Sequence, residues 1–254
     1  MPIFEMHFNI IGHMKNTNIL FLLLAVSFMA SCKKEASEKP KVSYDTSAKA
    51  KTPQKIDTTQ IEIADLPLQL QGTNYLIFPV GDLNIYGGSS KGYESSSNAN
   101  DIRFRISNYS ENEIAGYMRN LKFQAIGSDS ITALTDKPIM IQTATYLKTV
   151  ADKTKQQILV YTLADMDTNK DGKLDPSDIK SLYLSEISGK RFTKVSVDFE
   201  ELIDWNLIES SNRLYFRTIE DTNKNGEFDK NDVLHYHYID LSEKEWKVSD
   251  YNPV

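Results

Sequence analysis

Two twelve-residue loops of nearly the same sequence constrain this chain more than any other feature. Residues 167–178 read DTNKDGKLDPSD, and residues 221–232, which lie 54 positions later, read DTNKNGEFDKND. The similarity extends outward, because ILVYT and RLYFR precede the loops and SLYLSEIS and HYHYIDLS follow them. The sequence therefore predicts an internal repeat of strand, loop and strand.

Both loops carry oxygen-bearing side chains at the spacing D-x-N-x-(D/N)-G-x-φ-D-x-x-D, in which φ is apolar. Calcium takes about six to eight oxygen ligands, and the residues at positions 1, 3 and 5 of such a loop converge on one ion. The predicted ligands of the first loop are Asp167, Asn169, Asp171, the Lys173 carbonyl, Asp175 and Asp178. Those of the second loop are Asp221, Asn223, Asn225, the Glu227 carbonyl, Asp229 and Asp232. The sequence thus predicts two calcium sites.

The remaining loop positions fit the same interpretation. Gly172 and Gly226 stand where a sharp turn has to direct the next carbonyl at the ion. We expect the apolar residues Leu174 and Phe228 to hold the loops against the core. The first loop offers four carboxylates and the second three, so the first site is expected to bind more tightly. Polar turns alone are the alternative, but turn chemistry does not require this spacing in two aligned copies.

The loop pattern resembles the EF-hand loop and, more closely, the calcium loops of dockerins and of integrin-like propeller blades. Two departures matter. The last position is Asp in place of the usual Glu, so bidentate closure of the ligand shell is not implied. The flanking runs also have the composition of strands, which favours a strand-flanked, structural form of the loop over a helix–loop–helix unit.

From about Leu66 the chain consists of short runs rich in Tyr, Ile, Val, Phe and Thr, separated by Gly, Asn, Asp and Ser. Such runs predict strands and turns, and no long apolar segment has a helical period. We therefore expect an all-β body. The runs are NYLIFPV, DIRFRI, NLKFQAI, PIMIQTATYL, QQILVYTL, SLYLSEI, LIDWNLI, RLYFRTI and VLHYHYIDL.

Around the loops these strands fall into antiparallel sets of four. One set spans 138–197 and the next 202–250, and a looser set from 74 to 136 contains the Gly/Ser-rich insertion 87–100. The hairpins SLYLSEISGKRFTKVS and HYHYIDLSEKEWKVS resemble the outer hairpins of β-propeller blades. About three blades are fewer than the roughly four that a closed propeller needs. This leaves an open array, a truncated propeller, a propeller completed by another copy, or a β-sandwich.

The N-terminal segment predicts export and lipidation. Residues 19–30, ILFLLLAVSFMA, follow Lys15 and are too short for a comfortable membrane span but suited to a signal peptide. The small residues before Cys32 resemble the lipobox of bacterial lipoproteins, in which the cysteine is acylated after cleavage. Met14 is the expected start, so residues 1–31 are interpreted as an upstream extension and signal peptide. A buried helix with an incidental cysteine is the alternative.

Residues 32–65 are rich in Lys, Ser and Thr and are predicted to form a disordered tether to the domain 66–254. The Lys-Lys-Glu after Cys32 loosely resembles the surface-export signals of Bacteroidetes lipoproteins. We therefore expect an outer-membrane lipoprotein, on the periplasmic face or the cell surface. Cys32 is the only cysteine, so lipidation leaves no thiol for catalysis or for a disulfide.

Composition restricts the function further. A formal net charge of −6 argues against nucleic acid as a partner. His235 and His237 lie at i, i+2 and could bind a transition metal only with a third ligand from elsewhere. No nucleophile elbow, zinc-binding helix, Walker loop or Rossmann glycine pattern occurs. Four aromatic residues could line a carbohydrate-binding face, with cross-strand packing as the alternative: Trp205, Tyr215, Tyr236 and Tyr238.

Three functional hypotheses follow. The leading one is a calcium-binding, membrane-anchored lipoprotein that acts as a non-enzymatic binding or scaffold domain for a protein or glycan partner, with no catalytic residue. The second is a glycan-directed hydrolase whose carboxylate pair has no local motif. The third is a dockerin-like assembly module, which requires helices at 179–187 and 233–241.

Overall fold

Three antiparallel sheets make up the part of the chain that the computed structural model describes, residues 39–44, 61–83 and 106–254. The first sheet has the order β1 (Ile61–Ala64), β2 (Tyr75–Leu83), β5 (Asn120–Ala125), β6 (Ile131–Ala133). The middle sheet has the order β10 (Thr193–Lys194), β9 (Ser181–Glu186), β8 (Ile158–Ala164), β7 (Met140–Tyr146), β4 (Glu113–Met118), β3 (Ser107–Tyr109). The last sheet has the order β11 (Glu200–Ile208), β12 (Arg213–Glu220), β13 (Val233–Asp240), β14 (Val248–Asp250).

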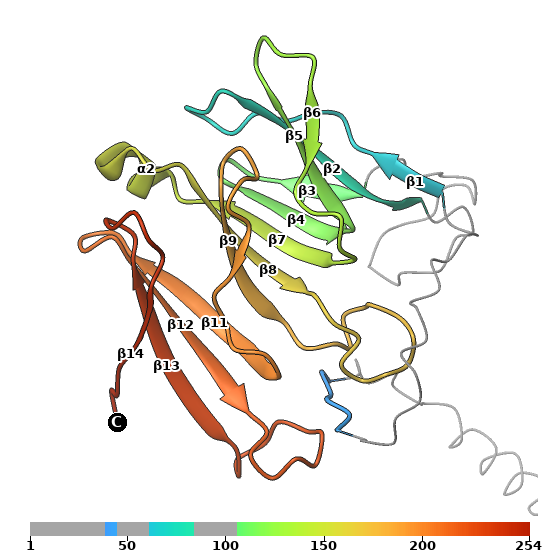
Figure 1. The fold of residues 1–254 in the computed structure, drawn as a ribbon, viewed down its shortest axis with the longest axis vertical. Coiled ribbons are helices and arrows are strands. Elements are labelled where there is room, and N and C mark those ends of the chain that lie inside the picture. The colour runs from blue at the N-terminus through green and yellow to red at the C-terminus, as the bar shows by residue number, and fades with distance from the viewer. Residues whose placement is uncertain (1–38, 45–60, 84–105) are drawn as a thin grey trace, which may run out of the picture. The chain divides into compact units, whose positions relative to one another are not determined.

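The prediction of an all-β body is confirmed, and none of the three sheets closes on itself (Figure 1). Both an open propeller-like array and a sandwich are consistent with this arrangement. One short helix, α2 (Lys148–Thr154), interrupts the connection between β7 and β8. The helix ends at Lys155, which takes a left-handed conformation at φ 64°. The Lys155 amide donates a hydrogen bond to the carbonyl of Ala151. Seven residues are too few for the 3.6-residue period to be visible in the sequence.

The middle sheet is buried on both faces. Alternate residues of β8 enter two different cores: Leu159 and Tyr161 pack with residues of the first sheet, and Ile158 and Val160 pack with residues of the last sheet. All four are at most 1% exposed. A strand covered on both sides reads as a continuous apolar run, which explains why ILVYTLA does not alternate with polar residues.

The predicted sets of four strands are confirmed for the last sheet and extended in the middle one. The strands of 202–250 pair in chain order as β11–β14. The strands of 138–197 pair as β7–β10, but β4 and β3 join them, because β4 pairs with β7 and buries Ile114 and Met118 in the shared core. The looser set from 74 to 136 therefore divides between two sheets, which the prediction did not foresee.

The predicted tether, residues 32–65, differs from the structure at both of its described parts. Residues 61–64 form β1, which pairs with β2, so the first sheet begins before residue 66. Residues 39–44 lie against both predicted calcium loops, and Val42 is only 4% exposed. These two polar segments are held in place by main-chain hydrogen bonds to segments far along the chain. Amino-acid composition carries no information about such contacts. The signal peptide, Cys32, the rest of the tether and the insertion 87–100 lie outside the described residues.

Candidate functional site

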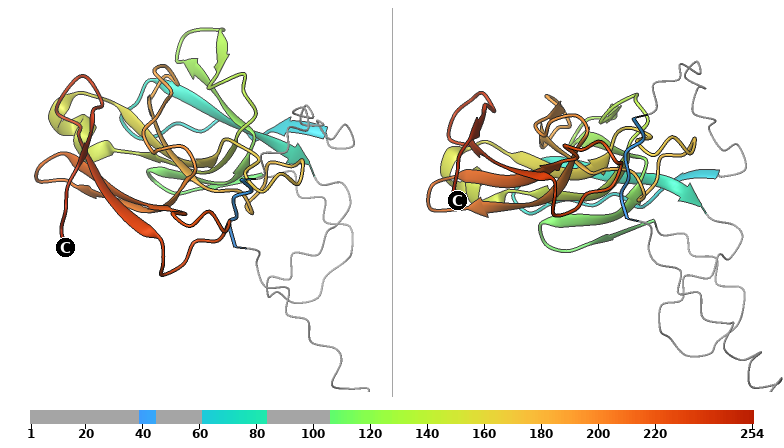
Figure 2. Two further views of the ribbon diagram at one scale, coloured as in Figure 1. Left: turned by 60° about the horizontal axis from the view of Figure 1, so that its bottom comes forward. Right: turned by 90° about the horizontal axis from the view of Figure 1, so that it is seen from below.

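The two predicted calcium loops lie at the same edge of the stacked sheets, with residues 39–44 between them (Figures 1 and 2). Residues 167–178 connect β8 to β9 in the middle sheet, and residues 221–232 connect β12 to β13 in the last sheet. Strand–loop–strand is therefore the repeated unit, as predicted. The structure places β9 at 181–186 and β13 at 233–240, so the helices that a dockerin-like module requires after each loop are not formed.

The first loop is held by hydrogen bonds from its own amides to its predicted ligands. The Asp167 carboxylate accepts the amides of Asp171 at 3.2 Å and Gly172 at 2.9 Å. The Asn169 side-chain oxygen accepts the Asp171 amide at 2.9 Å, and the Asp171 carboxylate accepts the Lys173 amide at 2.8 Å. These bonds hold the residues of positions 1, 3 and 5 in one turn.

The second loop repeats this pattern 54 residues later. Asp221 accepts the amides of Asn225 at 3.2 Å and Gly226 at 2.7 Å. The side chains of Asn223 and Asn225 accept the amides of Asn225 and Glu227 at 2.9 and 2.8 Å. Gly172 and Gly226 both have positive φ, 85° and 84°. The two loops thus have the same backbone form, and their nearly identical local sequences explain it.

The last ligand position closes each loop by joining its two halves. In the first loop Asp178 accepts the amide of Thr168 at 2.7 Å through Oδ1 and that of Asp175 at 3.0 Å through Oδ2. In the second loop Asp232 accepts the amides of Thr222 at 3.2 Å and Asp229 at 2.7 Å. Since a carboxylate offers about four lone pairs, each Asp keeps acceptor capacity after these bonds.

Asp178 is fully buried, and burial raises its pKa, against the lowering effect of the amides that it accepts. Asp175 and Asp229 at position 9 accept the amides of Ser177 at 2.8 Å and Asn231 at 2.7 Å. Every side chain that the sequence predicted as a ligand therefore takes part in the frame of its own loop.

The predicted ligands of both loops are oxygen donors. Three basic side chains of the domain, Lys180, Lys194 and Arg217, pair with acids outside the loops. The ligand set is made only of carboxylate, amide and carbonyl oxygens, which are the ligands that calcium takes. The residues present therefore fit a hard divalent cation.

The carboxylate oxygens of the loops are not drawn into a tight cluster. Among the described residues, the only group of at least three His, Cys, Asp or Glu side chains whose ligand atoms all lie within 4.8 Å is Glu200, Glu220 and His235. The oxygens of the loop carboxylates are instead directed to loop amides. This second group was missed, because its members come from three strands and share no motif.

The Glu200–Glu220–His235 group lies beside the second loop, on the face of the last sheet that also carries Phe216. Glu200 and Glu220 are cross-strand partners, and His235 Nε2 lies 3.1 Å from Glu220 and 4.0 Å from Glu200. His237 shares this face with His235, as predicted, but its Nδ1 lies 2.7 Å from Asp250. The two histidines therefore contact different acids and do not converge on one point.

The apolar loop residues do not anchor the loops as predicted. Leu174 and Phe228 are half-buried and belong to neither core cluster. The anchor of the first loop is Thr168, which is 3% exposed and whose hydroxyl accepts the amide of buried Ile179 at 3.1 Å. Threonine at position 2 of the repeat was the available signal, because Thr222 occupies the same position in the second loop.

Residues 39–44, hereafter the clasp, bond to both loops. The amides of Lys41 and Ser43 donate to carbonyls of the first loop, Ser177 at 3.2 Å and Thr168 at 2.8 Å. The amide of Val42, between them, donates to the Gly226 carbonyl of the second loop at 3.1 Å. An extended segment directs alternate residues to opposite sides, so it can bridge two loops in this way.

The last residue of the clasp reaches the second loop through its side chain. Burial, then the charge of Asp221 and a hydrogen bond to it, raise the pKa of Tyr44 to about 12. Asp221 itself is 2% exposed. The clasp thus contacts the first ligand position of this loop through Tyr44.

The aromatic residues of the last sheet divide between its two faces. Trp205 packs against the core that the middle and last sheets share. Tyr215, Tyr236 and Tyr238 lie on the opposite face and surround Tyr251, with ring centroids 5.3, 5.8 and 6.3 Å from its own. This half-exposed group, hereafter the tyrosine face, gathers three of the four aromatic residues named from the sequence.

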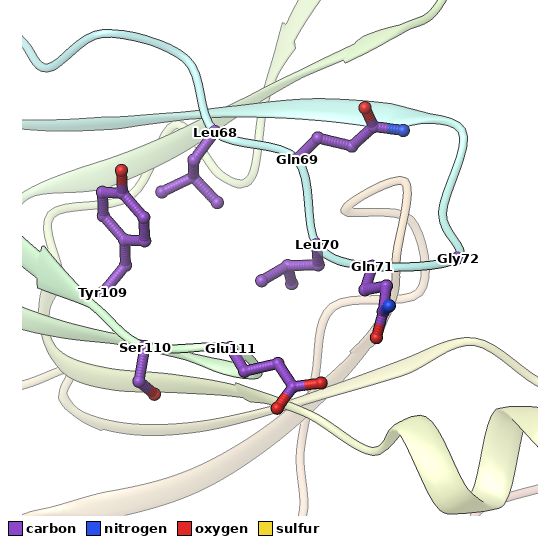
Figure 3. A pocket seen from close by; sticks show the side chains of 8 residues that line it. All are labelled: Leu68, Gln69, Leu70, Gln71, Gly72, Tyr109, Ser110 and Glu111. Atoms are coloured by element: carbon purple, nitrogen blue, oxygen red, sulfur yellow. The ribbon is translucent and has the colours of Figure 1, made fainter.

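Two hollows of the described part of the chain lie away from the loops. The larger, about 670 Å³, is lined by the segment 68–72 and by Tyr109, Ser110 and Glu111 (Figure 3). The smaller, about 350 Å³, contains Glu186 and lies where Arg191 stacks on Trp246 at 4.3 Å. Each hollow has a single carboxylate among its lining residues, so neither supplies the carboxylate pair of a glycan hydrolase.

Comparison with known proteins yields no relative from which a function could be transferred. No family model, no curated protein and no solved structure matches the chain. Within the described residues, no helix is long and apolar enough to cross a membrane.

Proposed function

We propose that this chain is a calcium-stabilised lipoprotein of the outer membrane that serves as a non-enzymatic binding or scaffold domain. Cys32 carries the lipid anchor, and the loops 167–178 and 221–232 each bind one calcium ion. The protein lies on the periplasmic face or at the cell surface and binds a protein or glycan partner.

One observation carries the calcium assignment. Two loops with one backbone form hold four and three predicted ligand carboxylates, each of which accepts amides of its own loop. Like charges within one short loop repel one another, and a bound cation relieves that repulsion. A calcium ion that binds only the native state adds its binding free energy to folding.

Calorimetric titration of the processed chain from Cys32, in detergent, tests this assignment. We expect two binding events and a melting temperature that falls when a chelator is added. Equal melting temperatures with and without chelator would exclude a structural role for calcium. Magnesium titration is the control, because Mg²⁺ demands a smaller octahedral site and retains its waters.

The lipid anchor has its own test. Metabolic labelling with a fatty acid should label the wild-type protein and leave the Cys32→Ser variant unlabelled and released from the membrane fraction. Ser37→Ala, five residues further on, is the control and should retain the label. A labelled Cys32→Ser variant would contradict the assignment.

The tyrosine face is the surface that best supports a binding role. Tyrosine rings supply large, rigid contact area with a polar end, as binding surfaces commonly do. Arg213 lies 4.8 Å above the Tyr238 ring, and Arg217 pairs with Asp204 across the neighbouring strand. A glycan partner would be supported if a polysaccharide in a native gel retards the wild-type protein and retards the Tyr236→Ala variant less. Retardation unchanged in that variant would remove this face from the proposal.

A further inference from the structure

We propose that the clasp docks between the two loops when calcium fills them, so that the ion and the clasp bind cooperatively. This inference rests on the calcium sites of the proposed function. It assigns the clasp, residues 39–44, as the segment that the pair of loops binds.

Main-chain hydrogen bonds join the clasp to both loops. Lys41 and Ser43 donate to the first loop, Val42 donates to the second, and the Thr168 hydroxyl of the first loop donates to the Lys41 carbonyl at 3.0 Å. Val42 is buried although it lies in a polar stretch of sequence. Both loops must therefore hold their backbone in place for the clasp to bind.

In the second loop, a hydrogen bond joins the predicted first calcium ligand to the residue that contacts the clasp. Asp221, the first predicted ligand, accepts the Gly226 amide at 2.7 Å, and the Gly226 carbonyl accepts the Val42 amide. A Cβ on Gly226 would lie 2.5 Å from the Val42 carbonyl oxygen. In the first loop the residue next to the first ligand Asp167 is Thr168, which contacts the clasp directly.

Calcium and clasp therefore favour the same loop backbone. Without the ion, repulsion between the ligand carboxylates opposes that backbone, and the carbonyls that receive the clasp lose their fixed positions. Coupling of this kind is reciprocal: if calcium strengthens clasp docking by some factor, docking strengthens calcium binding by the same factor.

Hydrogen exchange of the clasp amides in the processed full-length chain tests the proposal. We expect exchange in residues 39–44 to be about fivefold or more slower with calcium than with chelator, the lower end of common coupling strengths. Gly226→Ala should abolish this protection in calcium. Gly127→Ala is the matched control, because Gly127 has the same positive φ, lies outside both loops and has no atom within 4 Å of its added Cβ, and this variant should retain the protection.

A second variant leaves both loops intact. Val42→Asp places a charge at a buried position, so it should release the clasp. It should also weaken calcium binding, and the factor should equal the one by which calcium slows hydrogen exchange in the wild-type clasp. Lys39→Ala, at an exposed position, should change neither quantity. Two calcium events with equal clasp exchange in calcium and chelator would overturn the clasp proposal and leave the calcium sites standing. Absence of calcium binding would overturn both.

Discussion

The Asp178 carboxylate accepts the amide of Thr168 at 2.7 Å, and it shares the single hydroxyl proton of Thr168, whose oxygen lies 3.2 Å away, with the Lys41 carbonyl at 3.0 Å. Asp178 and Thr168 are at most 3% exposed. In the second loop, Asp232 accepts the amide of Thr222 at 3.2 Å, but the Thr222 hydroxyl donates to the Glu220 carbonyl at 3.3 Å. The first loop is therefore closed by buried contacts and the second by exposed ones.

The two threonines should differ in what they contribute to stability. Thr168→Ala leaves the buried Ile179 amide without its acceptor, which costs about 1–3 kcal/mol of unfolding free energy. Thr222→Ala removes an exposed contact and should change that free energy by less than about 0.5 kcal/mol. Urea unfolding of both variants, with chelator present, measures the difference. Equal losses would show that Thr168 does not anchor the first loop.

Exchanging the residues at the fifth position of the two loops should exchange the calcium affinities of the two sites. Asp171 and Asn225 each accept the amide two residues on at 2.8 Å, so Asp171→Asn and Asn225→Asp keep that bond and change only the charge. We expect Asp171→Asn to weaken the first site roughly tenfold and Asn225→Asp to strengthen the second by a similar factor, equivalent to about 1.4 kcal/mol each. Calorimetry of the single variants and of the double variant measures both constants. Affinities that do not respond to this charge would place the ion elsewhere.

Gly189 joins the middle sheet to the first through a close contact. It has φ 78°, and an added Cβ would lie 2.6 Å from Cδ2 of the buried Phe123 ring. Gly189→Ala should lower the free energy of unfolding by about 2–4 kcal/mol, the sum of left-handed strain and overpacking. Gly127→Ala is the matched control, since φ is 84° but the added Cβ meets nothing within 4 Å, and should cost about 1–2 kcal/mol. Thermal melts that give equal losses would contradict the contact with Phe123.

Glu201 should make the stability of the domain depend on pH. It is 5% exposed and pairs with Lys180 at 2.7 Å, yet burial outweighs this partner and raises the pKa of the carboxyl. A carboxyl whose pKa is raised on folding contributes stability that is fully present below its unfolded value, about 4.5, and is lost as pH rises through the folded value. Relative to Glu201→Gln, the wild type should therefore gain stability as pH falls from 7 to 4.

Chemical unfolding of wild type and variant across that pH range measures the effect. Glu243→Gln, at an exposed position, is the control and should leave the pH dependence unchanged. A wild type that loses stability relative to Glu201→Gln on acidification would show that the ion pair with Lys180 dominates.

Prediction from sequence succeeded where structure follows from neighbouring residues. The strands that flank both loops and the order of β11–β14 were predicted, because hairpins join strands that are consecutive in the chain. Strands β1 and β4 were not predicted. In β4, Gly116 interrupts the apolar pattern, and the structure shows why: a Cβ there would lie 2.7 Å from the Ile106 carbonyl.

By itself, the sequence determined the all-β class, the two loops and the hydrogen bonds within each of them. Those features depend on spacings of two to ten residues and on a glycine with positive φ. Only the tertiary structure decided that Val42 lies between loops 126 and more residues away, and that Glu200, Glu220 and His235 meet. These contacts form when packed sheets bring distant segments together, and the free energy that holds them comes from burial rather than from local sequence preference.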